Sequence, residues 1–171
     1  MSKLNYKLTK NTKMHLGVKL FQIEATVDFR WIKKGELGGW IEKTDNLSGD
    51  AWVYGNARVS GDAWVYGDAR VYGDARVSGN ARVYGNAWVS GNAWVSGNAR
   101  VYGNARVYGN AWVYGNAWVY GNARVYGNVK AQTGYWYAHQ KPEWDITKVS
   151  MPDGYETLVT DYKEAENPPK H

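Results

Sequence analysis

The sequence contains no cysteine, and this absence excludes disulfide scaffolds, thiolate metal sites and cysteine nucleophiles together. It also lacks any apolar run close to the roughly 18 residues that a membrane-spanning helix needs. The first residues place no apolar segment behind their lysines, so we expect no secretory leader. These absences predict a soluble, cytoplasmic protein without membrane contact.

Aromatic residues are abundant, with 14 Tyr and 10 Trp among 171 residues. This composition argues against intrinsic disorder, and the length suits one domain. The formal net charge is +5. Residues 1–48 hold nine Lys and Arg against five Asp and Glu, whereas residues 129–171 hold five against seven. We interpret the basic N-terminal end as a solvated charged edge, with contact to an anion as the alternative.

The dominant feature is a six-residue repeat, Gly-(Asn/Asp)-Ala-(Arg/Trp)-Val-(Tyr/Ser). It runs from Gly49 to Tyr126 as thirteen words without insertion or deletion, and weaker words extend it back to Leu37 and forward to Gln132. Within each word Ala and Val alternate with variable residues, which is typical of a short strand with one buried face. The Gly-Asn or Gly-Asp pair predicts the corner, since Gly, and next Asn and Asp, tolerate left-handed backbone angles.

Two arrangements of these short strands are compatible with the pattern. Antiparallel hairpins would give a narrow ribbon with little core. A coil of three strands instead lets each strand bond to the coils above and below and buries every Ala and Val. The sequence therefore predicts an all-β fold, a triangular parallel β-solenoid with small β caps at both ends.

The repeated Val-x-x-Asn-Ala-x pattern resembles the hexapeptide repeats of left-handed parallel β-helix proteins, and the left-handed coil is implied by that resemblance alone. Residues 33–48, KKGELGGWIEKTDNLS, followed by GDAWVY words, more closely resemble poorly characterised hexapeptide-repeat proteins of phages and prophages. Many left-handed hexapeptide proteins are acyltransferases or carbonic anhydrases, and their chemistry needs histidine. Here His15, His139 and His171 all lie outside the thirteen words, so we expect no enzyme activity, no metal and no cofactor.

The pattern divides the chain into three segments: an N-terminal β cap (1–36), the repeat β-helix (37–132), and a C-terminal cap and tail (133–171). In the first, alternation predicts strands around Leu4–Leu8 and Phe21–Phe29, joined around Lys10–Gly17. In the last, residues Tyr155–Tyr162 predict a strand before a frayed tail from Glu164, while Tyr135, Trp136, Tyr137 and Trp144 predict a local apolar core. His139 with Glu143 is interpreted as a surface pair and not as an acid/base pair.

With three words per coil, the variable residues stack into columns on three faces. The candidate binding residues are Trp64, Arg82, Arg100, Trp118, Tyr66, Tyr84, Tyr102 and Tyr120 on one face and Trp52, Arg70, Trp88 and Arg106 on another. Two interpretations stay open. The columns stabilise the tube by stacking, or they form a binding surface, since Trp, Tyr and Arg are common anchors of protein interfaces and also stack bases. The corner residues Asp50, Asp62, Asp68 and Asp74 are interpreted as solvated surface acids.

The function predicted from these patterns is a non-catalytic β-solenoid of phage or prophage type that presents its columns to a protein partner, with inhibition of a host defence component as one form. The alternatives are binding or sequestration of a nucleotide or nucleic acid, and a structural homo-oligomer (dimer or trimer) or virion scaffold. A hexapeptide acyltransferase is the alternative that the sequence favours least.

Overall fold

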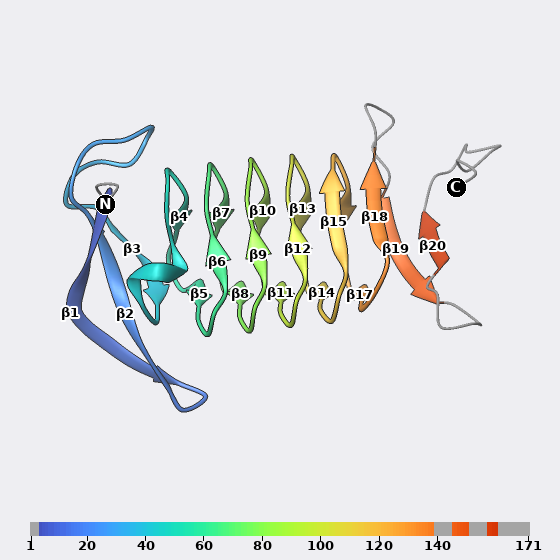
Figure 1. Cartoon of the computed structure of the whole chain (residues 1–171), viewed down its shortest axis with the longest axis horizontal. Helices are drawn as coiled ribbons and strands as arrows, with labels where there is room; N and C mark the ends of the chain where they lie inside the picture. The colour runs from blue at the N-terminus through green and yellow to red at the C-terminus, as the bar shows by residue number, and fades with distance from the viewer. Residues whose placement is uncertain (1–3, 139–144, 151–156, 161–171) are drawn as a thin grey trace.

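The computed structural model describes residues 4–138, 145–150 and 157–160. Within them the repeat winds into about five stacked coils whose strands form parallel sheets along a tube (Figure 1). Each coil holds three words, since Trp88 pairs with Arg70 in the coil before and with Arg106 in the coil after. The predicted three-word parallel β-solenoid is confirmed. Its left-handedness stays a prediction.

The tube has three faces, which we number by the strands that form them. The first face contains β4 (Trp52–Val53), β7 (Arg70–Val71), β10 (Trp88–Val89), β13 (Arg106–Val107), β16 (Arg124–Val125), β19 (Asp145–Ser150) and β20 (Thr157–Thr160). The second contains β1 (Tyr6–His15), β2 (Val18–Ala25), β3 (Leu37–Ile41), β5 (Arg58–Val59), β8 (Arg76–Val77), β11 (Trp94–Val95), β14 (Trp112–Val113) and β17 (Lys130–Ala131). The third contains β6 (Trp64–Val65), β9 (Arg82–Val83), β12 (Arg100–Val101), β15 (Trp118–Gly121) and β18 (Tyr135–Ala138). One 3₁₀ turn, η1 (Thr44–Asn46), precedes the first perfect word.

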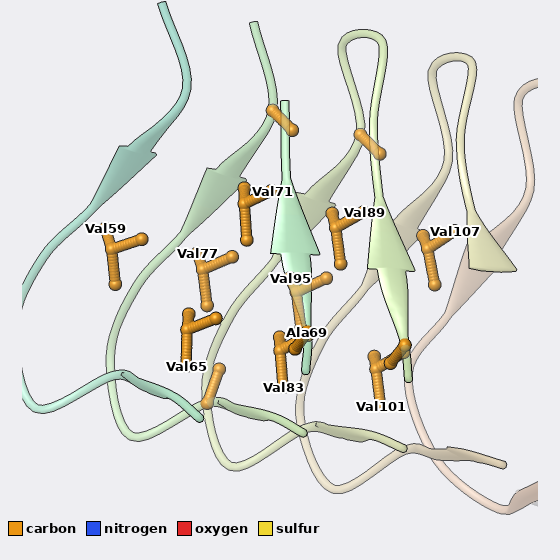
Figure 2. Packing of buried hydrophobic residues seen from close by; sticks show 14 of the residues in the cluster. Val59, Val65, Ala69, Val71, Val77, Val83, Val89, Val95, Val101 and Val107 are labelled. Atoms are coloured by element: carbon orange, nitrogen blue, oxygen red, sulfur yellow. The ribbon is translucent and has the colours of Figure 1, made fainter. Parts of the chain in front are cut away.

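The interior is built from the Ala and Val of every word, which are all at most 2% exposed. Figure 2 shows valines from the three faces pointing into the same core, with Val59, Val65 and Val71 as successive examples. Neighbouring coils are joined by backbone hydrogen bonds; the amide of Arg82, for instance, donates to the carbonyl of Ala99 at 2.9 Å. Burial of the small side chains and satisfaction of the backbone are therefore achieved by the same coil geometry.

The corners depend on glycine alone for their left-handed backbone. Repeat glycines have φ between 56° and 71°, whereas Leu16 and Arg30 are the only described residues other than glycine with positive φ. The prediction that Asn and Asp share the left-handed backbone angles of the corners is therefore wrong. Corner asparagines instead hydrogen-bond between coils: the Nδ2 of Asn80 donates to the Oδ1 of Asn98 at 3.2 Å, and Asn98 donates likewise to Asn116.

The N-terminal segment forms an antiparallel hairpin of β1 and β2 at one end of the tube (Figure 1). The turn is only Leu16–Gly17, with φ of 48° and 80°, so the predicted connection from Lys10 is wrong for residues 10–15, which extend β1. Strand β2 also ends at Ala25 and not at Phe29. Because β2 pairs with β3 and β3 pairs in parallel with β5, the hairpin continues the second-face sheet.

At the other end, β18 pairs in parallel with β15, and β19 pairs in parallel with β16 and antiparallel with β20. Strand β20 lies inside the strand predicted at Tyr155–Tyr162, whereas β19 was not predicted. Trp144 and the tail from Glu164 to His171 lie outside the described residues. No helix within the described ranges has the length and apolar character that crossing a bilayer requires.

Candidate functional site

The third face carries an unbroken stack of tyrosine rings. Tyr66, Tyr84, Tyr102 and Tyr120 are nearly parallel, with successive ring centroids 4.8, 4.9 and 5.1 Å apart. Trp64 extends the stack at 4.1 Å from Tyr66. The spacing equals the strand separation of a sheet, because each coil contributes one ring in register. Burial is the main cause of the raised pKa of Tyr84, and neighbouring Tyr66 adds to it.

Arginine and tryptophan lie beside this tyrosine column. Arg82 is exposed, Trp64 is 39% exposed, and the guanidinium of Arg100 lies 4.5 Å from the ring centre of Trp118. The indole Nε1 of Trp64 donates to the Oγ of Ser48 at 2.8 Å. The eight candidate residues predicted for one face thus lie on the same sheet, and the surface they form is aromatic and basic.

On the first face, Trp52 does not lie in the surface column predicted for it. This side chain is 1% exposed, because Phe29 packs edge-on against it at 5.5 Å, so its prediction as a surface binding residue is wrong. The physical reason is position: Trp52 belongs to the first perfect word, which the N-terminal segment covers. A Cβ on Gly38 would lie 2.8 Å from the Trp52 ring, so this close packing requires glycine there.

A residue from outside the repeat takes the place of Trp52 in the surface column. Trp31 is 48% exposed and lies 3.6 Å from the guanidinium of Arg70, and its Nε1 donates to the Oη of Tyr54 at 2.6 Å. Trp88 follows, held between Arg70 at 4.9 Å and Arg106 at 4.8 Å. The sequence held no periodic indication of Trp31, since it precedes the repeat.

Side chains of the hairpin reach the beginning of the second face. The Nζ of Lys13 lies 4.1 Å from the ring centre of Trp40, and burial, followed by the charge of Arg58, lowers the pKa of Lys13 to about 8. His15 lies nearby; burial is the main cause of its lowered pKa, and Arg58 and Arg76 add to it. Farther along, Trp94 and Trp112 pack edge-on at 5.1 Å.

The early corner acids are partners of the N-terminal segment. Arg30 forms ion pairs with both Asp50 and Asp68, and the Nζ of Lys43 lies 2.6 Å from the Oδ1 of Asp62. The hydrogen bond from Lys43 is the main cause of the lowered pKa of Asp62. Interpretation of these acids as merely solvated is therefore wrong for three of them. Asp replaces Asn at corners that lie against cations of the first 48 residues.

The residues considered for catalysis are scattered or outside the described chain. His139, Glu143 and His171 lie outside the described residues, and the Nε2 of His15 is buried without a hydrogen-bond partner. Within the described ranges, no three His, Asp or Glu side chains lie close enough together to hold a metal ion.

One known protein family has a sequence model that matches the coiled part of the chain. The YdcK beta solenoid repeat model matches nine overlapping segments, at residues 51–67, 63–79, 69–83, 75–91, 81–97, 93–107, 99–115, 105–121 and 117–129. The protein is a β-solenoid repeat protein. Together these matches run from residue 51 to residue 129, so β1 to β3, η1 and the strands from β17 onward are unmatched. The search of curated proteins finds no match. The β-solenoid fold hosts unrelated activities, so the match alone assigns no function.

Proposed function

We propose that this β-solenoid is a non-catalytic binding protein whose third face engages a protein partner. The observation that carries the proposal is the parallel stack from Trp64 through Tyr120, with Arg82 exposed beside it. Trp, Tyr and Arg are the residue types that most often dominate binding energy at protein interfaces. Rings fixed by stacking lose little conformational freedom on binding, which favours affinity.

The third face is a better candidate than the other two for steric reasons. The hairpin places Lys13 over Trp40 on the second face, and Trp31 and Phe29 cover the beginning of the first face. On the third face, Trp64 and Arg82 of the first two repeat strands are exposed. A partner can therefore approach this face along the stack from Trp64 onward.

The proposed partner is a host protein, including a component of host defence, that the tube inhibits by occupying its surface. The support for this finer statement is the resemblance of residues 33–48 to phage and prophage proteins. A column of aromatic rings that extends over four coils, with arginines beside it, suits a protein surface better than a small substrate. Binding without chemical conversion is part of the proposal.

The test is affinity capture from lysate of the cells that carry the gene. The third-face variant Arg82→Gln/Arg100→Gln is expected to lose the partner that the unaltered protein captures. The matched control is Arg76→Gln on the second face, which removes a similar guanidinium and should retain the partner. Capture of the same partner by the third-face variant, at a stoichiometry equal to the unaltered protein, would contradict the proposal.

Light scattering separates partner binding from self-association. Tyr84→Ser/Tyr102→Ser introduces a residue that the repeat already uses at this position. Loss of a dimer or trimer in this variant would assign the third face to contact between copies of the chain. An unchanged oligomeric state together with loss of the captured partner would support the proposed function.

A further inference from the structure

The tyrosine column of the first face lacks one ring. Its positions are Tyr54, Tyr72, Ser90, Tyr108 and Tyr126, so serine stands where the other four coils have tyrosine. On the third face the equivalent column is complete, with rings 4.8–5.1 Å apart. One coil of the first face is therefore missing a ring that its backbone geometry would accommodate.

The missing ring leaves a hollow of about 190 Å³, lined by Tyr72, Trp88, Ser90, Arg106, Tyr108 and Arg124. A cavity of about 150 Å³ is enough to admit benzene. Tyr72 and Tyr108 are two coils apart, or about 9.6 Å along the tube. A ring level with Ser90 would then lie about 4.8 Å from the level of each neighbour, which is the spacing of the sheet itself. The hollow has room for one aromatic ring.

The walls of this hollow, the Ser90 hollow, are held in place by other rings. Tyr108 is nearly parallel to Tyr126, with centroids 5.0 Å apart. Tyr72 packs edge-on against Tyr54 at 6.5 Å and against Trp88 at 6.1 Å. Ser90, only 9% exposed, lies at the base and supplies a hydroxyl. A ligand ring would meet a largely formed site.

The charge lining the hollow has one sign. Arg106 is exposed and its guanidinium lies 4.8 Å from the ring centre of Trp88, so it is positioned at the rim while its outer edge can bind an anion. Arg124 also lines the hollow, and no acidic residue does. An aromatic slot with a guanidinium at its rim is the arrangement that stacks a ring and pairs with an attached anionic group.

We propose that the Ser90 hollow binds a planar aromatic ring that carries an anionic group, with the ring between Tyr72 and Tyr108 and the anion on Arg106. A nucleotide and an aromatic carboxylate share this chemistry. The site lies on the first face and goes beyond the proposed function, which concerns the third face. Failure of one therefore leaves the other standing.

The test is calorimetric titration of the full-length protein with AMP and with indole-3-acetate, alongside adenosine and inorganic phosphate. We expect saturable binding of at least one aromatic anion. Tighter binding of AMP identifies a nucleotide site, and tighter binding of indole-3-acetate an aromatic carboxylate site. Adenosine and phosphate should each bind at least tenfold more weakly, because each lacks one of the two recognised groups.

The decisive variant is Ser90→Tyr, which completes the column and fills the slot, and we expect it to weaken binding at least tenfold. Its matched control is Ser96→Tyr, the same word position on the second face, which should leave affinity within twofold. Tyr108→Ser removes a wall and should also weaken binding at least tenfold, so the test survives misfolding of the first variant. Arg106→Gln should weaken the aromatic anions and leave adenosine unchanged.

Three results would overturn the proposal. The first is no binding of either aromatic anion at about 10 mM, roughly ten times a dissociation constant of 1 mM. The second is unaltered affinity in a folded Ser90→Tyr variant. The third is phosphate binding as tightly as AMP, since the ring would then contribute nothing.

Discussion

Replacing Gly91 by alanine should destabilise the tube more than the same change at Gly55, although both glycines occupy the same position of the repeat. Both have left-handed backbones, with φ of +64° and +56°. A Cβ on Gly91 would lie 3.1 Å from both the N and the O of Gly109 in the next coil. A Cβ on Gly55 would meet no heavy atom within 4 Å. The pair therefore separates the cost of the backbone angle from the cost of contact between coils.

The magnitudes can be worked from these contacts. An L residue in the left-handed region costs roughly 1–2 kcal/mol, and the reduced freedom of the unfolded chain offsets about 0.4–1 kcal/mol of it. Gly55→Ala should thus lower the free energy of unfolding by about 1 kcal/mol. Gly91→Ala adds overpacking against the backbone of Gly109, for which about 1–3 kcal/mol is typical. The two variants should differ by that second amount.

The assay is urea unfolding followed by circular dichroism and by tryptophan fluorescence. Both probes are needed, because repeat proteins are stabilised coil by coil and a single transition has to be demonstrated before free energies are compared. Equal losses in Gly91→Ala and Gly55→Ala, or a larger loss in the second, would refute the reasoning. That result would mean that the coils separate locally without cost.

Three further predictions concern residues whose environments differ within the repeat. Trp52→Ala should lower the free energy of unfolding, measured in urea, by about 3–5 kcal/mol, as is usual for a buried Trp. Trp112→Ala should lower it by less than half of that amount, because the Trp112 side chain is 41% exposed. Asp68→Asn removes an ion pair with Arg30 and should cost about 0.2–1 kcal/mol at low salt, a loss that 1 M salt should abolish. The pKa of Lys13 is about 8 in the folded protein, against a usual value of 10.5. Between pH 8 and 10.5 the folded protein therefore binds fewer protons than the unfolded chain, and stability should rise with pH across this window. Lys13→Met should flatten this rise in thermal melts recorded at a series of pH values.

Each of these predictions has a result that would contradict it. Comparable losses of unfolding free energy in the two tryptophan variants would mean that Phe29 does not cover Trp52 in solution. A salt-independent effect of Asp68→Asn would point to packing and not to charge. A pH profile unchanged by Lys13→Met would show that the ammonium group of Lys13 is solvated and lies away from Trp40 and Arg58.

The architecture of the coils could be predicted from the sequence because its causes are local. Alternation of Ala and Val within a word decides which side chains face inward, and a glycine every sixth residue places the corners. Stacking of words 18 residues apart then follows from three faces per coil, as the pairing of Trp88 with Arg70 and Arg106 confirms. The columns on each face are consequences of that register.

Only the tertiary structure distinguished words that are identical in sequence. Trp52 and Trp112 occupy the same AWVYGN sequence, yet one is 1% exposed and the other 41%. The difference arises from Phe29, which lies outside the repeat and packs edge-on against Trp52. Likewise, Arg30 and Asp68 are 38 residues apart in the chain and meet through the fold alone.

The sequence by itself determined the coil, because each six-residue word has the same glycine corner and the same buried Ala and Val, and therefore folds in the same way as the word before it. The tertiary structure decided how the hairpin lies against that coil, which residues it buries, and where the missing ring at Ser90 becomes a hollow between Tyr72 and Tyr108. The physical reason is that a local pattern specifies its own conformation, whereas burial and ion pairing depend on whatever distant segment comes to lie against it.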